Sequence, residues 1–279
     1  MLSFEDKVIP LDSWITAFID WLVEGYRWFF QGIKWPVEVT LTSIQNGLVA
    51  TPPLVIIGVL GLIAWRVSGL KLGGFTIGTL VFIGLLGLWE DTMITLAMVF
   101  CSVVFCTVVG IPLGILAGRS DNFEASLRPV LDAMQTTPAF VYLVPIVMLF
   151  SIGNVAGVLA TIVFALPPII RLTSLGIRQV HPELVEAALA FGATSWQVLV
   201  KVQIPLALPT IMAGLNQTIM MALSMVVIAA LIGAGGLGAP VVLGLNTLDI
   251  GLATIGGLAI VLMAIVLDRI TQSMGTQKK

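Results

Sequence analysis

Apolar residues are concentrated in seven long runs, which shorter polar stretches separate. The runs cover approximately residues 50–67, 72–89, 92–118, 134–153, 155–173, 207–232 and 248–267. A helix that crosses the hydrocarbon of a bilayer needs roughly 20 predominantly apolar residues, and a chain in lipid must satisfy its backbone hydrogen bonds internally. The pattern therefore predicts an all-α, polytopic membrane protein with about seven spans, which form a transmembrane domain over residues 48–273.

Residues 12–31 show a different pattern, in which polar and apolar positions alternate with a helical period. The apolar face is rich in aromatic residues, namely Trp14, Phe18, Trp21, Trp28 and Phe29. The opposite face carries Asp20, Glu24, Arg27 and Gln31. An aromatic-rich amphipathic helix of this kind lies in the plane of the membrane interface. We expect residues 1–47 to form an outside N-terminal segment that contains this helix.

The composition agrees with a membrane location. Of the 279 residues, 58% are hydrophobic and 10% are charged, whereas roughly a quarter of the residues in a soluble domain are charged. The formal net charge of −2 provides no basic surface for nucleic acid, so membrane lipid is the expected surrounding. Cys101 and Cys106 lie five residues apart in one apolar run, and we expect neither a disulfide nor a metal site from them.

The basic residues predict an orientation. If the N-terminus lies outside and seven spans alternate, ten of the 13 Lys and Arg residues fall inside. These are Arg66, Lys71, Arg119, Arg128, Arg171, Arg178, Lys201, Arg269, Lys278 and Lys279. Lys7, Arg27 and Lys34 fall outside. This distribution follows the positive-inside rule, and it predicts a multi-pass protein whose C-terminal tail, residues 274–279, lies inside.

Residues 174–206 form an inside segment that is too polar to span the membrane and too apolar for an ordinary solvated loop. Pro182 suits the first turn of a helix, and Gly192 suits the end of that helix. Thr194 then opens a second helix, because Gln197 three residues later completes the pattern of a capping box. The segment is therefore predicted to be a short helix–turn–helix.

Each of these two helices has an apolar face. The first face holds Leu184, Ala187, Ala188 and Phe191, and the second holds Trp196, Leu199 and Val200. Pro205 and Pro209 are expected to limit the second helix. Apolar surface exposed to water usually marks a site where another protein binds. The alternative is a loop that packs on the protein's own helices.

Two anchors in this segment stand at a fixed spacing. Glu186-Ala187-Ala188 is followed after three residues by Gly192, and nine residues further on comes Val202-Gln203-Ile204-Pro205. The arrangement resembles the EAA loop of ABC importer permeases, whose pattern ends in Ile-x-Leu-Pro, so that Val202 and Ile204 are conservative departures. The resemblance implies a type I ABC importer transmembrane domain, in which a loop at about residues 178–206 docks into a groove of a separate ATPase subunit.

The resemblance also implies which residues couple the two subunits. They are Glu186, Ala187, Ala188, Phe191, Gly192, Ala193, Trp196 and Pro205. ATP and Mg²⁺ would bind to two copies of the partner ATPase, and this chain itself would bind no cofactor or metal. A second permease copy and an extracytoplasmic substrate-binding protein complete the implied assembly in the bacterial inner membrane. We expect the two permease copies to form a homodimer, with a heterodimer as the alternative.

Three further stretches resemble the glycine betaine/proline, or choline-type, permeases. They read MQTTPAFVYLVP at residues 134–145, FALPPIIRLT at residues 164–173 and AGLNQT at residues 213–218. The likeness extends from about residue 90 to the end of the chain. It implies import of an osmoprotectant of the quaternary ammonium type, such as glycine betaine or choline.

The energy source also points to a partner. The predicted span interiors contain no Asp, Glu, Lys, Arg or His, whereas carriers driven by protons or sodium use ionisable groups or broken helices near the midplane. The chain lacks the G-x-x-x-x-G-K-[ST] phosphate loop. Residues 233–238 match G-x-G-x-x-G, but they follow an apolar run instead of a strand. We interpret them as a flexible outer turn or gate.

Candidate path residues lie on the predicted fourth to sixth spans. Aromatic faces hold quaternary ammonium groups well, so Phe140, Tyr142 and Phe164 are candidate contacts, with ordinary helix packing as the alternative. Asn216 and Gln217 are costly in hydrocarbon unless they face a partner or a cavity, which makes them candidates for lining the path.

Other classes of function fit the sequence less well. A passive channel for small solutes, the main alternative, would use the same spans but would not need the docking helices. An intramembrane enzyme would need a nucleophile–base set or metal ligands inside the spans, and the single histidine, His181, lies outside them. A membrane scaffold would not need the EAA spacing. We therefore interpret the chain as a permease subunit that is not itself an enzyme.

Overall fold

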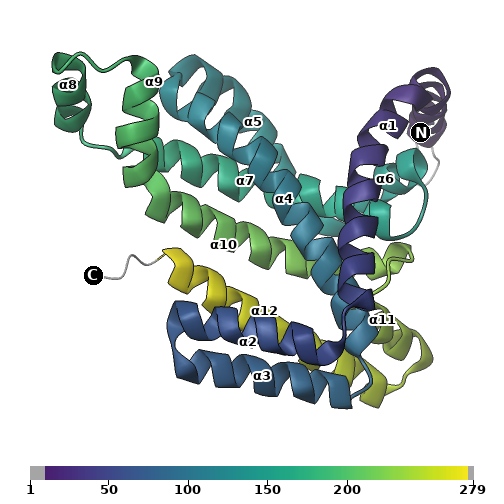
Figure 1. Ribbon diagram of the computed structural model, residues 1–279. Coiled ribbons are helices and arrows are strands. Elements are labelled where there is room, and N and C mark those ends of the chain that lie inside the picture. Colours follow the sequence, from purple (N-terminus) through teal and green to yellow (C-terminus); the bar gives the residue numbers. More distant parts are fainter. Residues whose placement is uncertain (1–9, 276–279) are drawn as a thin grey trace, which may run out of the picture.

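The computed structural model describes residues 10–275, and this part of the chain is helical without any strand (Figure 1). The helices are α1 (Leu11–Ala50), α2 (Pro53–Ser68), α3 (Leu70–Leu85), α4 (Trp89–Arg119), α5 (Asp121–Thr136), η1 (Ala139–Tyr142), α6 (Leu143–Phe150), α7 (Asn154–Arg178), α8 (Pro182–Ala190), α9 (Ser195–Val198), η2 (Leu199–Gln203), α10 (Ile204–Ala229), η3 (Ala230–Ile232), α11 (Gly238–Thr247) and α12 (Ile250–Gly275). Most of the expected inside tail at 274–279 lies outside the described residues.

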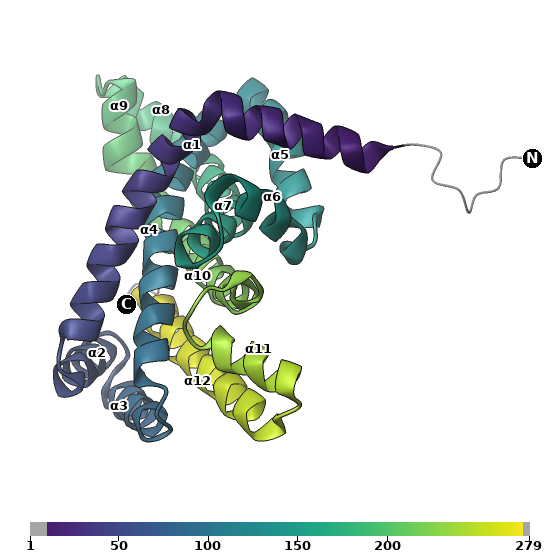
Figure 2. The ribbon, with the colours of Figure 1, turned by 90° about the vertical axis from the view of Figure 1, so that its right-hand side faces the viewer.

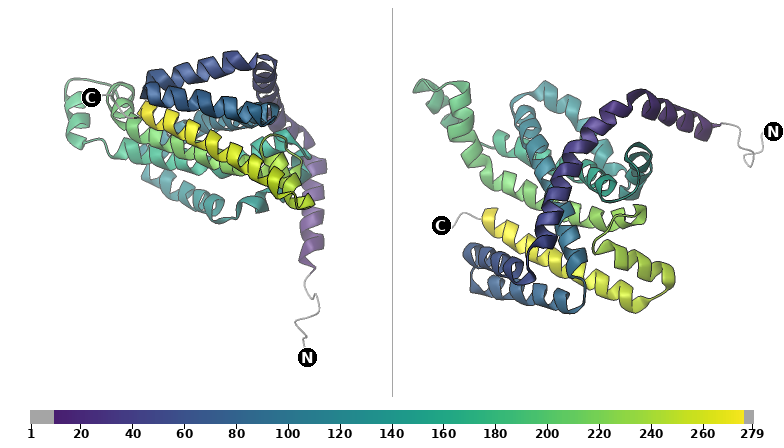
Figure 3. Two further views of the ribbon diagram at one scale, coloured as in Figure 1. Left: turned by 90° about the horizontal axis from the view of Figure 1, so that it is seen from below. Right: turned by 45° about the vertical axis from the view of Figure 1, so that its right-hand side comes forward.

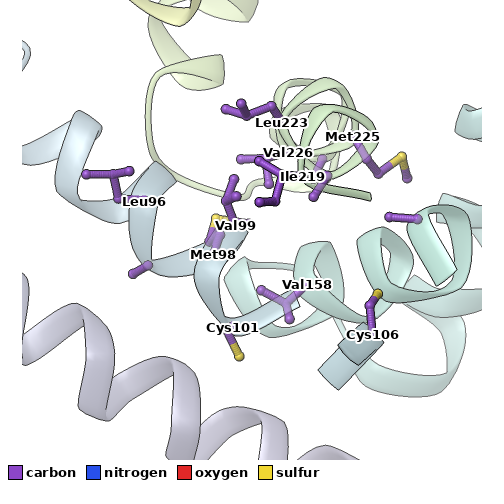
Figure 4. Close-up of a cluster of buried hydrophobic side chains, with 14 of the residues drawn as sticks. Leu96, Met98, Val99, Cys101, Cys106, Val158, Ile219, Leu223, Met225 and Val226 are labelled. Atoms are coloured by element: carbon purple, nitrogen blue, oxygen red, sulfur yellow. The ribbon is translucent and has the colours of Figure 1, made fainter. Parts of the chain in front are cut away.

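Three long helices, α4, α7 and α10, pack most extensively against one another and form the centre of the bundle. Glycines permit the close approach of α4 to α7. A Cβ atom added at Gly114 would lie 2.5 Å from Cβ of Thr173, and one at Gly110 would lie 2.3 Å from Cγ2 of Ile169. Figure 4 shows side chains from α4, α7 and α10 meeting in this core, among them Val99, Val158 and Val226.

A second layer lies along this centre. α2 and α3 form an antiparallel hairpin beside α12, and α11 packs against the first part of α12 (Figure 3). α12 also contacts α10, so the hairpin is joined to the core mainly through α12. α11 was not predicted from the sequence, because its ten residues are too few to produce a membrane-span signal.

α1 differs from the prediction. The expected amphipathic helix at 12–31 does not end there, because α1 continues to Ala50 with a bend where Tyr26 leaves helical geometry at φ −121° and ψ 23°. The part before the bend extends away from the bundle (Figure 2). The part after it packs on α4 and buries Val37 and Leu41. These two residues are four positions apart and so share one helix face. Charged neighbours such as Lys34 and Glu38 lower the mean hydropathy of this stretch, so the apolar face was not recognised from the sequence.

The expected span at 134–153 is also corrected. α5 ends at Thr136, and the chain bends by 104° between α5 and α6. Pro138 explains the break, because a proline pushes the preceding residue away from helical geometry, and Thr137 has an extended ψ of 127°. α5 itself was not predicted.

Four described helical segments are long and apolar enough to cross a membrane. They are Trp89–Arg119, Asn154–Arg178, Ser195–Ile232 and Ile250–Met274. Two bent pairs raise the number to six if each pair is one span, and Leu70–Leu85 is shorter. By length and composition the structure supports four to six spans, besides the shorter apolar helix Leu70–Leu85, and the expected number of about seven stays a prediction.

Candidate functional site

The predicted helix–turn–helix is present as α8 and α9. Pro182 begins α8, and Gly192 has a φ of +83°, in the left-handed region where glycine has no steric penalty. The N–H of Gly192 donates to the carbonyl of Leu189 over 2.9 Å, and the N–H of Ala193 donates to the carbonyl of Ala188 over 3.1 Å. This pair of bonds is a Schellman motif, so Gly192 closes α8 as predicted.

The predicted capping box opens α9. The N–H of Gln197 donates to Oγ1 of Thr194 over 3.3 Å, and the N–H of Thr194 donates to Oε1 of Gln197 over 2.8 Å. Both N–H groups would otherwise lack partners at the helix start. The shape of the loop between α8 and α9 is therefore set by contacts within the loop itself.

The prediction that Pro205 and Pro209 limit the second helix is wrong. α9 runs through a π-helical turn, η2, directly into α10, in which both prolines lie. Pro205 stands in the first turn of α10, where a missing N–H is tolerated. The wider π-helical turn η2 before it already departs from the regular α-helical hydrogen-bond pattern. The loop is consequently continuous with a long core helix.

Most of the apolar surface of α8 and α9 is open to solvent. Phe191 is 93% exposed and Trp196 is 68% exposed, whereas Leu199 is buried. Glu186 and Ala187 are exposed as well. Figure 1 shows α8 and α9 projecting beyond the end of the bundle. The alternative of a loop packed on the protein's own helices does not describe Phe191 or Trp196.

The loop lies at the basic end of the molecule. The turn between α2 and α3, the end of α4, the α7–α8 connection and the end of α12 lie on the same side in Figure 1. Arg66 and Arg119 occupy the last turns of α2 and α4, and Arg178 is the last residue of α7. Asp91 lies in the first turn of α4, at the opposite end of that helix. The described basic residues at these helix ends thus lie at the same end of the molecule as α8 and α9.

Of the candidate path residues on η1, Tyr142 packs against the core, whereas Phe140 is mostly exposed. η1 contacts α7 and α10, and Phe140 is 61% exposed. The hydroxyl of Tyr142 donates to the carbonyl of Met134 over 2.6 Å, so this side chain holds the bend between α5 and α6 together. Phe164 on α7 is partly buried at the edge of the core. Contact of these residues with solute stays a prediction.

Asn216 is already engaged inside the chain. Its Nδ2 donates to Oδ1 of Asp268 over 3.0 Å, and its Oδ1 accepts from the hydroxyl of Thr271, which joins α10 to α12. Gln217 beside it is exposed. This network was not predicted from the sequence, because the last predicted span stopped at residue 267, whereas α12 continues through Asp268. The i, i+3 spacing of Asp268 and Thr271 on an apolar helix was the available signal.

The glycine-rich turn after η3 is tied to neighbouring helices. The N–H of Gly235 donates to Oδ1 of Asn154 over 2.7 Å, and the N–H of Leu237 donates to Oγ1 of Thr95 over 2.8 Å. The turn follows a helix rather than a strand, so the structural context of a dinucleotide site is missing. The predicted position as a turn is confirmed, and its backbone is held by these two bonds.

A comparison with known families decides the class of this protein. Residues 110–275 match the family described as "Binding-protein-dependent transport system inner membrane component". The chain belongs to this family. Because the match covers α7, the α8–α9 loop, α10 and α12, it includes the whole candidate loop.

Relatives within this family share almost the whole chain. It is 56% identical over 276 residues to the glycine betaine/proline betaine transport system permease protein ProW of Escherichia coli (strain K12), covering 99% of this chain and 78% of that protein. It is 45% identical to the glycine betaine transport system permease protein OpuAB of Bacillus subtilis (strain 168), covering 97% of this chain and 96% of that protein. The sequence resemblance to betaine permeases is therefore confirmed.

Solved structures show the same fold. The MetNI methionine ABC transporter in an inward-facing conformation matches with a TM-score of 0.58 and 26% sequence identity. The match covers 66% of this chain and 93% of that chain. The protein is thus the all-helical membrane component of an ABC transport system, with the type I importer fold. Its relatives are permease components and not enzymes themselves.

Proposed function

We propose that this chain is the permease subunit of an ATP-driven importer for a betaine-like quaternary ammonium solute, and that it couples to a separate ATPase through α8 and α9. The observation that carries the proposal is the exposed apolar surface around Phe191, which projects from the basic end of the bundle. A large apolar side chain that is almost fully exposed favours a protein partner.

The loop has the mechanical properties that coupling requires. It is closed by its own Schellman motif and capping box, so it can move as one unit. It is joined to α7 on one side and continues through η2 into α10 on the other. Movement of a partner bound to α8 would therefore reach two core helices directly.

The substrate class rests on the relatives. Their names specify glycine betaine, proline betaine and carnitine, which all contain a quaternary ammonium group. Phe140, Tyr142 and Phe164 supply aromatic rings near η1 and α7, and an aromatic face attracts such a cation. We propose these rings as weak contacts along the path, while high-affinity recognition belongs to an extracytoplasmic binding protein.

The proposed assembly contains two ATPase copies, which carry ATP and Mg²⁺, and two permease copies, with a homodimer as the simplest arrangement. The basic end with α8 and α9 faces the cytoplasm, which places the N-terminus outside and the C-terminus inside. The positive-inside rule supports this orientation, because Arg66, Arg119 and Arg178 lie at that end.

Co-purification with the ATPase tests the proposal. Glu186→Lys and Gly192→Asp should each weaken ATPase binding by at least about fivefold, which corresponds to loss of an interface residue worth about 1 kcal/mol. Uptake of labelled glycine betaine into proteoliposomes that contain the whole complex should fall in parallel. Ser195→Ala, on the same loop, is the control and should behave as wild type.

The outcome separates the alternatives. Normal ATPase binding and uptake by both loop variants would overturn the coupling assignment. Solute flux without ATP in the wild-type protein would favour the passive channel. A panel of labelled glycine betaine, carnitine, choline and proline, each with the binding protein present, identifies the solute.

A further inference from the structure

Arg178 lies at a junction of helix ends close to the coupling loop. It is the last residue of α7, and α8 begins four residues later at Pro182. Its Nη1 donates to Oδ1 of Asp121 over 2.6 Å. Its Nη2 contacts Oε2 of Glu124 at 2.8 Å and donates to the carbonyl of Ala117 over 2.8 Å. One guanidinium thus connects the ends of α4, α5 and α7.

The guanidinium of Arg178 bonds both a backbone carbonyl of α4 and side-chain carboxylates of α5. Ala117 lies in the last turn of α4, where carbonyls have no partner within the helix. Asp121 and Glu124 lie in the first turn of α5. A planar guanidinium with five donors can serve these acceptors together, whereas a lysine ammonium cannot reproduce the fork.

α5 is attached to the core by a few apolar side chains and by ion pairs at its two ends. Leu131 is its one buried residue, and its outer part is tied down by a second ion pair, in which Nη2 of Arg171 lies 2.5 Å from Oδ1 of Asp132. A cavity of about 280 Å³ lies beneath it, lined in part by Leu127 and Ser174. An element with few buried apolar contacts is the kind that moves at low free-energy cost.

The helices beside α5 are built in the opposite way. Cβ atoms added at Gly114 on α4 or Gly176 on α7 would meet neighbouring helices at 2.5 Å and 3.1 Å. α4, α7 and α10 therefore move as a close-packed body, while α5 can change its position on that body. Arg178 belongs to this body, contacts α5 and precedes the first residue of the coupling loop, Pro182, by four positions.

We propose that Arg178 is a positioning residue that transmits movement of the α8–α9 loop to α5, and through the bend at Pro138 to α6. This inference rests on the proposed function, because it requires that the loop is moved by an ATPase. Arg178 itself binds neither solute nor nucleotide. Its role is to make the position of α5 depend on the position of the loop.

Measuring glycine betaine uptake per ATP hydrolysed by the whole reconstituted complex tests this role. Arg178→Gln should leave ATPase co-purification at the wild-type level but lower the ratio by about fivefold or more, the usual size of coupling between distant sites. Arg178→Lys should give a ratio between that of the wild type and that of Arg178→Gln. Arg66→Gln, an exposed arginine at the same end of the molecule, is the matched control and should keep the wild-type ratio.

A charge exchange distinguishes transmission from simple folding. Arg178→Glu should lower the ratio, and adding Glu124→Arg should restore part of it, because the pair is then rebuilt with reversed signs. If Arg178→Gln keeps the ratio of the Arg66→Gln control, the inference is overturned. A double variant no better than Arg178→Glu also counts against it.

The two proposals fail in distinguishable ways. If the wild-type chain does not bind an ATPase, or Gly192→Asp binds and transports normally, the proposed function itself fails. If Gly192→Asp loses ATPase binding while Arg178→Gln couples normally, the loop assignment stands and only the role of Arg178 is rejected.

Discussion

Single residues on α4 fix how closely the central helices approach. Gly110, Gly114 and Gly118 recur at four-residue spacing, and an added Cβ at any of them would lie within 3.0 Å of a residue on α7. In lipid, close packing and van der Waals contact replace much of the hydrophobic drive between helices. The small size of these residues is thus a packing requirement that their spacing in the sequence already indicated.

Gly114→Ala should destabilise the protein by about 1–3 kcal/mol, the usual cost of overpacking a core, because its new methyl group would meet Cβ of Thr173 at 2.5 Å and the carbonyl of Ile170 at 2.8 Å. Thermal unfolding in detergent measures the change. Gly74→Ala is the matched control, since a Cβ there meets nothing within 4 Å, and it should be neutral or stabilising. Equal melting temperatures for the two variants would contradict the packing argument.

The two tyrosines of the chain allow a second test at this scale. Tyr142→Phe removes the hydroxyl that bonds the carbonyl of Met134, at a cost of about 1 kcal/mol. Amide hydrogen exchange should then rise over residues 133–143. Tyr26→Phe is the control and should leave exchange in that region unchanged. Should both variants exchange alike, the hydroxyl does not hold the bend.

At the scale of elements, the molecule combines segments whose shape is local with segments whose position depends on the rest of the fold. The α8–α9 loop belongs to the first kind, because Gly192 and the Thr194–Gln197 pair close it from within. α5 belongs to the second kind. Its start is capped by Ser120, but its place on the bundle depends on Arg171 and Arg178 of α7.

Thr194→Ala should loosen the loop without affecting the core. Loss of a helix cap costs about 1 kcal/mol, so protease cleavage and hydrogen exchange should increase at residues 190–199 while the unfolding temperature of the bundle stays constant. Ser195→Ala, one position later, provides the control. Greater exchange in α7 or α10 would show that the cap also supports the core.

At the scale of the whole molecule, hydrophobicity places the helices in the membrane, and the distribution of charge decides which end of the bundle faces which side. Apolar helices such as α4 and α12 can cross a membrane in either direction, and the gathering of arginines at one end selects between the two. The same end carries the exposed loop, so the proposed orientation also gives the proposed ATPase access to α8 and α9.

Labelling with a membrane-impermeant maleimide tests this orientation. Arg66→Cys and Arg269→Cys should react in inside-out vesicles, whereas Asp249→Cys, in the turn between α11 and α12, should react in right-side-out vesicles. The native Cys101 and Cys106 are buried, so the wild-type chain supplies the background. The reverse labelling pattern would rule out the proposed orientation of the loop.

Local patterns determined much of this protein without its structure. Apolar runs predicted α4, α7, α10 and α12, because solvent preference acts on each helix separately. The Gly192 turn and the Thr194–Gln197 box were predictable since their hydrogen bonds join residues three to five apart. The spacing of the loop anchors indicated the family that the comparison confirmed.

Only the tertiary structure decided the rest. The continuation of α1 past Gln31, where Val37 and Leu41 pack on α4, depends on neighbours that a linear reading does not show. Arg178 bonds Asp121, 57 residues earlier, and Asn216 bonds Asp268, 52 residues later. Periodicity reports which face of a helix avoids water, but it does not report which other helix covers that face. Partners distant in the chain are chosen by the packing of the whole bundle.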